Sequence, residues 1–304
     1  MNKIFVAVAA VLFGTSGVAV QLLAPGLSAF TTAGWRVVLG GATLVALSAA
    51  CGQAPWRYAQ RWRVTCIGAV AFVVFQLGFF ASVSLSGVST ATIITIGIGP
   101  VVAGLLDRIR QGRPLRRRWW IGFGIAVVGI ALTTGAGAIS PNPAGWASAL
   151  IAGCCFPIFG SAVRDLATDR PAVTAAATVF GAAILPAAVL LTFAGGPVVA
   201  PSTITALLYV GVVATGIAYT FWSAGLARLT LADTVTLTML EPIAAAVLAI
   251  AILGETAGPV IIVGIATTLV GVWIASTGRQ EQDTADRSGN NIRLSLIKGR
   301  RRMW

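Results

Sequence analysis

Residues 236–255 read TLTMLEPIAAAVLAIAILGE, an apolar run that carries one acidic residue, Glu241, in its interior and Pro242 directly after it. A helix needs about 20 residues to cross the hydrocarbon core of a bilayer, so this run is long enough to span one. A charged side chain at the bilayer centre costs roughly 2.5–3.5 kcal/mol on insertion scales and therefore faces a cavity or a partner. Glu241 is thus a candidate functional residue if the run crosses a membrane.

The composition of the whole chain is that of a membrane protein. Of its 304 residues, 57% are hydrophobic and 10% are charged, whereas soluble domains carry about a quarter charged residues. Division of the sequence at its charged and Gly/Pro clusters leaves ten apolar runs. They are Ile4–Leu23, Ser28–Ala50, Val64–Leu85, Ser89–Leu106, Trp119–Ala138, Gly145–Val163, Ala172–Phe193, Thr203–Leu226, Leu231–Leu253 and Pro259–Ser276. We therefore predict an all-α membrane protein with ten transmembrane helices.

The positions of the basic residues predict the orientation. A net charge of +12 suggests nucleic-acid binding, but the Lys and Arg residues of the loops alternate strictly between the two sides. If the N-terminus is cytoplasmic, every second loop carries them and the opposite loops carry none, which is the positive-inside rule. This pattern argues against a nucleic-acid partner and predicts that both termini are cytoplasmic. Residues 278–304 form a polar, basic tail that we expect to be disordered and to contact anionic membrane lipids.

The chain also contains an internal repeat, which predicts two units, residues 1–138 and 139–277. Each unit holds five runs, an odd number, so the second unit enters the membrane from the opposite side. Inverted repeats are typical of secondary transporters, although a membrane scaffold protein remains the alternative from another class. The basic start of the chain also fits a cleaved signal peptide, but that segment has an internal counterpart in the second unit. A shift of 142 or 143 residues pairs Pro100 with Pro242, Gly122 with Gly264, Gly129 with Gly271, Phe13 with Phe156, Gln76 with Tyr219 and Phe79 with Trp222.

Two ionisable residues lie deep inside the predicted spans, Arg36 and Glu241. At about 1.5 Å per residue, Arg36 lies roughly 12 Å from the outer end of its run and Glu241 roughly 15 Å from the inner end, in a core about 30 Å thick. The two charges therefore lie at similar depth and can form a pair. Such a pair either orders the helix bundle or meets a charged substrate or a proton.

Other candidates for the site come from the prolines and aromatic residues. Pro100 and Pro242 are paired by the repeat, and each removes a backbone donor in mid-span, so we predict helix kinks that line a site shared by both units. Aromatic residues concentrate in the third and eighth runs, and most such residues in membrane helices face lipid or neighbouring helices. The predicted substrate-binding residues are Arg36, Gln76, Phe79, Tyr219, Trp222 and Glu241.

Several kinds of chemistry have no sequence signature here. The chain has no P-loop, no His and no metal-ligand cluster, so we expect no ATPase, no catalytic residues, no metal and no cofactor. The glycines seven residues apart in the fifth and tenth runs allow close helix packing, either within the fold or in a homodimer. A small molecule is the expected partner.

Ten spans in two units, an Arg in the second span and the string LEP…LGE (Leu240 to Pro242, then Leu253 to Glu255) resemble the EamA-type members of the drug/metabolite transporter superfamily. The first unit departs from the acidic pattern, with Gly99 opposite Glu241 and Arg113 opposite Glu255. The resemblance implies a multi-pass exporter of the bacterial cell (inner) membrane that works by alternating access. Its substrates would be amino acids or related metabolites; drug or nucleobase-type efflux is the alternative, and Glu241 is available for proton coupling.

Overall fold

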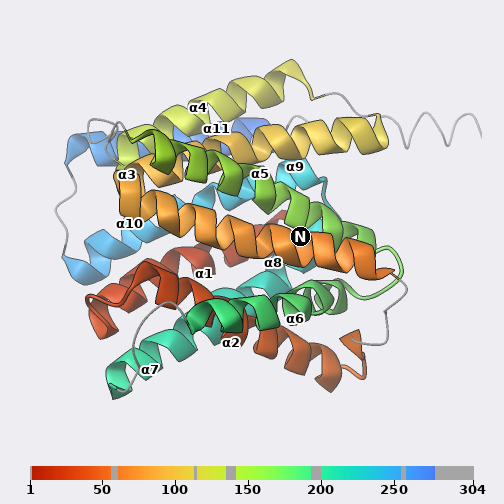
Figure 1. The fold of residues 1–304 in the computed structure, drawn as a ribbon. Helices are drawn as coiled ribbons and strands as arrows, with labels where there is room; N and C mark the ends of the chain where they lie inside the picture. The colour runs from red at the N-terminus through yellow and green to blue at the C-terminus, as the bar shows by residue number, and fades with distance from the viewer. Residues whose placement is uncertain are drawn as a thin grey trace, which may run out of the picture.

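The computed structural model of the chain describes residues 2–55, 61–112, 115–134, 142–192, 200–254 and 258–277. The tail from residue 278, Arg113 and Glu255 lie outside the described residues. The described part consists of helices and contains no strand, which confirms the prediction of an all-α protein. Figure 1 shows these helices lying along one another as a bundle.

The helix bounds follow the apolar runs of the sequence closely. Within the described residues, eight helical segments are long and apolar enough to cross a membrane. One of the eight, Trp62–Arg110, covers two predicted spans. The helix Arg117–Thr134 (α4) is not among the eight, because Arg117 and Arg118 lower the mean hydropathy of its 18 residues. The helices are α1 (Asn2–Leu23), α2 (Ala29–Ala50), α3 (Trp62–Gln111), α4 (Arg117–Thr134), α5 (Pro143–Leu166), α6 (Ala172–Leu191), α7 (Pro201–Leu208), the π-helix η4 (Tyr209–Ile217), α8 (Ala218–Leu226), α9 (Leu231–Thr238), α10 (Leu240–Leu253) and α11 (Pro259–Thr277).

The long helix α3 reverses direction at Gly87. This residue has φ +80° and ψ 161°, a backbone conformation that glycine adopts readily and other residues do not. Both halves of α3 lie against α5: Gly78 packs on the carbonyl of Ser148, and the Thr95 hydroxyl donates to the carbonyl of Ala149 at 3.2 Å. A continuous helix of 50 residues could not contact the same 24-residue helix along both halves.

The proline positions differ in their local structure. The predicted ninth span is interrupted at Met239, which separates α9 from α10, and Pro242 follows in the first turn of α10. Pro100 lies inside the second half of α3, where the residues on both sides keep helical backbone angles. The two residues paired by the repeat therefore stand in different surroundings, one beside a helix break and one in a continuous helix.

The glycines spaced seven residues apart, Gly122 and Gly129 on α4 and Gly264 and Gly271 on α11, are the points where these two helices touch within one chain. The two helices lie at an edge of the bundle (Figure 1). A Cβ atom at any of the four would overlap backbone atoms of the facing helix. Gly129, for example, faces the amide of Thr268 and the carbonyl of Gly264. Because backbone cannot yield as a side chain does, these positions need glycine.

This contact predicts a position-specific loss of stability. Gly129→Val places a branched side chain against the backbone of α11, and we expect it to lower the free energy of unfolding by about 1–3 kcal/mol or more, as overpacking does. Gly124→Val on the same helix is the matched control, because a Cβ at Gly124 meets nothing within 4 Å. Thermal unfolding of the two detergent-purified variants checks this; equal midpoints would contradict the packing role.

Candidate functional site

Arg36 lies in the middle of α2 and is half-buried. Its Nε donates a hydrogen bond to Oγ1 of Thr215 on η4 at 3.3 Å. Tight packing holds the two elements together, since Gly40 of α2 lies against Thr215 and Gly211 of η4 lies against Leu39. The remaining guanidinium nitrogens of Arg36 make no ion pair within 4.0 Å among the described residues.

Thr215 is a site residue that sequence reasoning missed. Its hydroxyl donates to the carbonyl of Val210, five residues earlier, at 2.8 Å, as the wider turns of a π-helix allow. Short π-helical segments occur frequently at functional sites. The repeat pairs Thr215 with Phe72, so the alignment of the two units contained no polar signal for this position.

Glu241 lies in the first turn of α10, directly after the interruption at Met239. Its backbone is covered by α1, because Gly14 packs against the Glu241 carbonyl. Its side chain is half-buried and has no hydrogen-bond or ion-pair partner among the residues that the structure describes. The structure therefore does not join Arg36 and Glu241 in a direct ion pair, although the two charges are near enough to interact electrostatically.

Tyr219 lies near both charges and belongs to a buried aromatic cluster. Its hydroxyl interacts electrostatically with Arg36 and Glu241. Its ring centroid is 4.8 Å from that of Phe13 and 4.8 Å from that of Phe180. We use the name aromatic cluster for Phe13, Phe72, Phe159, Phe180, Tyr219 and Trp222, which come from α1, α3, α5, α6 and α8.

Trp222 has a structural role in this arrangement. Its side chain is fully buried, and its Nε1 donates to Oγ1 of Thr238, the last residue of α9, at 3.3 Å. The ring stacks on Phe159 with centroids 5.6 Å apart. The indole N–H of Trp222 thus has a hydrogen-bond partner, and its ring has an apolar contact, both within the protein.

Gln76 and Phe79 lie on the first half of α3, at different places. Gln76 is buried and lines a groove of about 340 Å³ between α2, α3 and α6. Ser28, Val37, Val73 and Leu191 are among the other residues that line it. Phe79 is half-buried and makes ring contacts with Phe75 and Phe80. Of the predicted residues, the structure thus brings together Arg36, Tyr219 and Glu241, with Gln76 in the groove and Phe79 outside the aromatic cluster.

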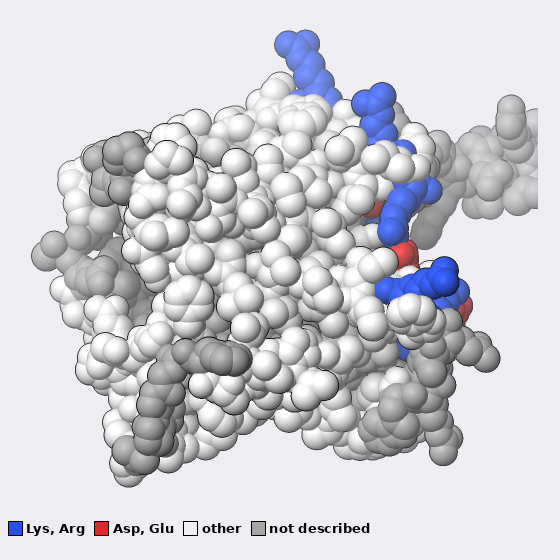
Figure 2. All heavy atoms as spheres, viewed as in Figure 1, with Lys and Arg blue, Asp and Glu red and all other residues white. Residues whose placement is uncertain are grey.

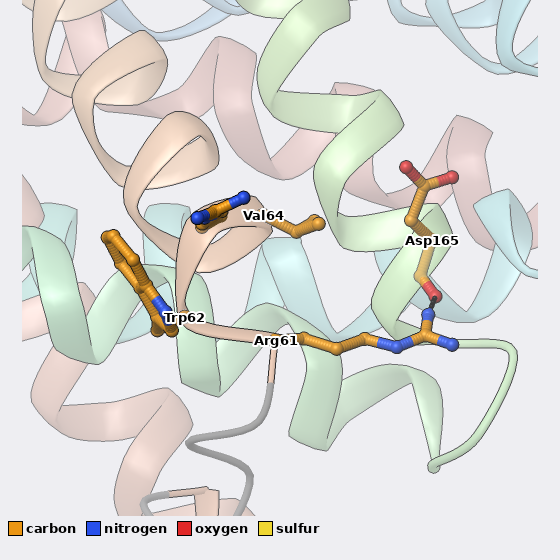
Figure 3. A pocket seen from close by; sticks show the side chains of 5 residues that line it. Arg61, Trp62, Val64 and Asp165 are labelled. Atoms are coloured by element: carbon orange, nitrogen blue, oxygen red, sulfur yellow. Dashed lines mark hydrogen bonds between the residues drawn. The ribbon is translucent and has the colours of Figure 1, made fainter.

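The groove lies toward the end of the bundle away from the basic residues, because Ser28 precedes α2 and Leu191 ends α6, whereas α6 begins two residues after Arg170. Figure 2 shows Lys and Arg side chains, with Asp and Glu side chains among them, gathered at one end of the face in view. A hollow of about 450 Å³ lies at that basic end, lined by Arg61 to Val64 and by Asp165 (Figure 3). There Arg61 donates to the carbonyl of Asp165 at 2.8 Å. This hollow is an exposed surface feature that none of the mid-depth charges lines.

The arrangement can bind a ligand that carries charge. It offers one cation and one anion at mid-depth beside the aromatic cluster, and the groove is lined by Val37, the residue next to Arg36 in the chain, but not by Arg36, Tyr219 or Glu241. Among the described residues, no group of three or more His, Cys, Asp or Glu could hold a metal ion.

Comparison with known proteins assigns the chain to a protein family. The EamA-like transporter family matches residues 2–135 and, a second time, residues 143–277. The protein named "Uncharacterized transporter YwfM" of Bacillus subtilis (strain 168) is 30% identical over 291 residues, which cover 93% of this chain and 96% of that protein. A crystal structure described only as that of a protein aligns with a TM-score of 0.78 and 19% identity, covering 90% of this chain and 97% of that one, and shows the shared fold alone. Since the family matches nearly all of the described helices in two copies, the chain belongs to the EamA-like transporter family and is a membrane transporter.

Proposed function

We propose that this chain is a secondary transporter that exports an amino acid or a closely related zwitterionic metabolite across the cell (inner) membrane by alternating access. The observation that carries the proposal is the pair of opposite charges, Arg36 and Glu241, near one another in mid-bundle without a direct ion pair. Each charge is half-buried. Groups of this kind in a membrane usually mark a substrate path.

A zwitterion supplies what the two residues lack. The guanidinium of Arg36 uses Nε for Thr215 and keeps its two Nη groups for a carboxylate, which arginine binds in a planar, directional way. The carboxylate of Glu241 can accept from an ammonium group. The side chain of an amino acid bound between the two charges would lie beside the aromatic cluster that contains Tyr219, and an aromatic side chain would gain the most from such contacts.

The same proposal includes ten membrane crossings with both termini in the cytoplasm. The reversal at Gly87 turns α3 into two crossings, and α4 supplies the crossing that hydropathy alone does not identify. The start of α1 and the end of α11 lie at the same end, because Lys3 Nζ donates to the carbonyl of Ser276 at 2.6 Å. This is the basic end, which the positive-inside rule assigns to the cytoplasm.

Alternating access is supported by the position of the groove. The groove is lined by Ser28 and Leu191, at the ends of α2 and α6 that lie away from the basic residues, whereas the hollow at the basic end is lined by none of the mid-depth charges. We therefore assign this conformation as facing outward. Glu241 is the acidic group at mid-depth that a proton-coupled cycle would use.

Removal of the Glu241 charge tests the substrate site. A hydrogen bond to a charged group is worth about 1.5–3 kcal/mol, so Glu241→Gln is expected to lower the transport rate at low substrate concentration by more than about tenfold. The measurement is uptake into proteoliposomes over a panel of labelled amino acids. Asp169→Asn is the control, because Asp169 forms an exposed ion pair with Arg61. Normal transport by Glu241→Gln would remove it from the site, and a panel on which the wild type moves nothing would overturn amino-acid transport.

The geometry of Arg36 gives a second test. Arg36→Lys keeps the charge but loses the fork of donors, so we expect a rise in KM of about tenfold or more for substrates with a free carboxylate. Amides of the same amino acids should lose much less. Equal effects on acids and amides would show that Arg36 holds the bundle together and does not bind the carboxylate.

A further inference from the structure

We propose that Asp107, Arg164 and the N-terminus of α9 form a latch that holds the basic end of the transporter closed, and that α9 links this latch to Glu241. The inference extends the proposed function, because a latch has a role only in a protein that opens to both sides. The contact of Asp107 with Arg164 and α9 can be tested without any substrate.

Asp107 is a buried acid with both carboxylate oxygens engaged. Oδ1 accepts from Nη1 of Arg164 at 2.9 Å, and Oδ2 accepts from the backbone amide of Ala232 at 2.9 Å. The side chain of Asp107 is 2% exposed and that of Arg164 is 27% exposed. Ala232 is the second residue of α9, so the carboxylate also lies at the positive end of a helix dipole. Removal of the Asp107 charge would take the ion-pair partner from the partly buried guanidinium of Arg164, and removal of the Arg164 charge would take an ion-pair partner from the buried carboxylate of Asp107.

The latch joins the two units of the repeat. Asp107 lies near the end of α3 in the first unit, whereas Arg164 on α5 and Ala232 on α9 belong to the second. If the two units rock against one another, the contact must open whenever the basic end opens. Two further ion pairs between the units at this end are exposed: Arg61 with Asp169, whose side chains are 43% and 53% exposed, and Arg110 with Asp165, whose side chains are 48% and 37% exposed.

The repeat shows that this device has no counterpart at the other end. The shift that pairs the units places Ala249 opposite Asp107, Gln21 opposite Arg164 and Thr90 opposite Ala232. No ion pair can form among those three side chains. The two units therefore share the helix arrangement, but the latch is present at the basic end alone. The latch favours the conformation in which the basic end is closed.

Helix α9 connects the latch to the mid-depth site. All eight of its residues are buried, and a helix of this length spans about 12 Å. Its first turn is held by Asp107, and its last residue, Thr238, accepts from Trp222. The interruption at Met239 follows, and Glu241 comes two residues later. A change at Glu241 can thus move α9 as a rigid rod and loosen the amide of Ala232 from Asp107.

Cysteine accessibility measures the state of the latch directly. Cys51, Cys66, Cys154 and Cys155 are first replaced by Ser in the full-length chain. A reporter, Ala103→Cys, is fully buried one turn before Asp107 on α3; a second reporter, Leu190→Cys, lines the groove at the opposite end. Labelling of each by a hydrophilic maleimide is followed with and without Asp107→Asn.

Opening of the latch predicts opposite changes at the two reporters. Asp107→Asn should raise the labelling rate at position 103 by more than about tenfold, as expected when a buried ion pair loses one partner, and should lower the rate at position 190. Partial unfolding would raise both rates, and an unchanged rate at position 103 would show that Asp107 does not hold the end closed. Either result overturns the proposal.

Three further variants separate the latch from charge in general. Arg164→Gln should reproduce the effect of Asp107→Asn, and the double variant should show no more than either single one, because the two residues act as a unit. Arg61→Gln should change labelling by less than about twofold, since exposed ion pairs contribute little. Equal effects of Arg61→Gln and Asp107→Asn, or no effect of Arg164→Gln, would contradict the latch. Because the labelling experiment needs no substrate, it tests the latch independently of whether the protein transports amino acids.

Discussion

The cost of charge in an apolar bundle is the constraint on which the rest of the structure depends. Arg36 and Glu241 lie in mid-bundle, where each would be unfavourable alone. Each occurs where the regular α-helix changes, Arg36 against the π-helix η4 and Glu241 directly after the interruption at Met239. Irregular backbone is tolerated at this depth only where it is buried in protein or lines a cavity. The charges and the helix irregularities therefore occur together for one physical reason.

Close backbone contacts hold this arrangement together. Gly14 packs on the carbonyl of Glu241, and Gly40 packs on Thr215. At the edge of the bundle, Gly129 and Gly264 let α4 and α11 meet backbone to backbone. Since lipid tails provide no hydrophobic drive for helices to associate, such close contacts and a few polar bonds hold a membrane bundle together. The aromatic cluster adds a dense centre around Tyr219.

The repeat separates what the two units share from what one unit holds alone. The glycines of α4 and α11 are shared, and they face each other in the structure. The charges are not shared: Glu241 stands opposite Gly99, and Asp107 stands opposite Ala249. The scaffold is therefore repeated in the two units, whereas the charges are not. The surroundings of Pro100 and Pro242 differ in the same way, because only the second adjoins a helix break.

The sequence by itself determined the helical class, the apolar spans within a few residues and the family, because hydropathy and the repeat are properties of the chain alone. It also identified Arg36 and Glu241, since a charge in an apolar run needs no structure to be noticed. Only the tertiary structure decided which side chains meet. Thr215 and Asp107 were missed because a threonine in an apolar run and an acid beside a basic loop are unremarkable until the fold brings Arg36 and Arg164 to them. Contacts between residues more than 50 positions apart depend on how the helices pack, and one-dimensional periodicity carries no information about that.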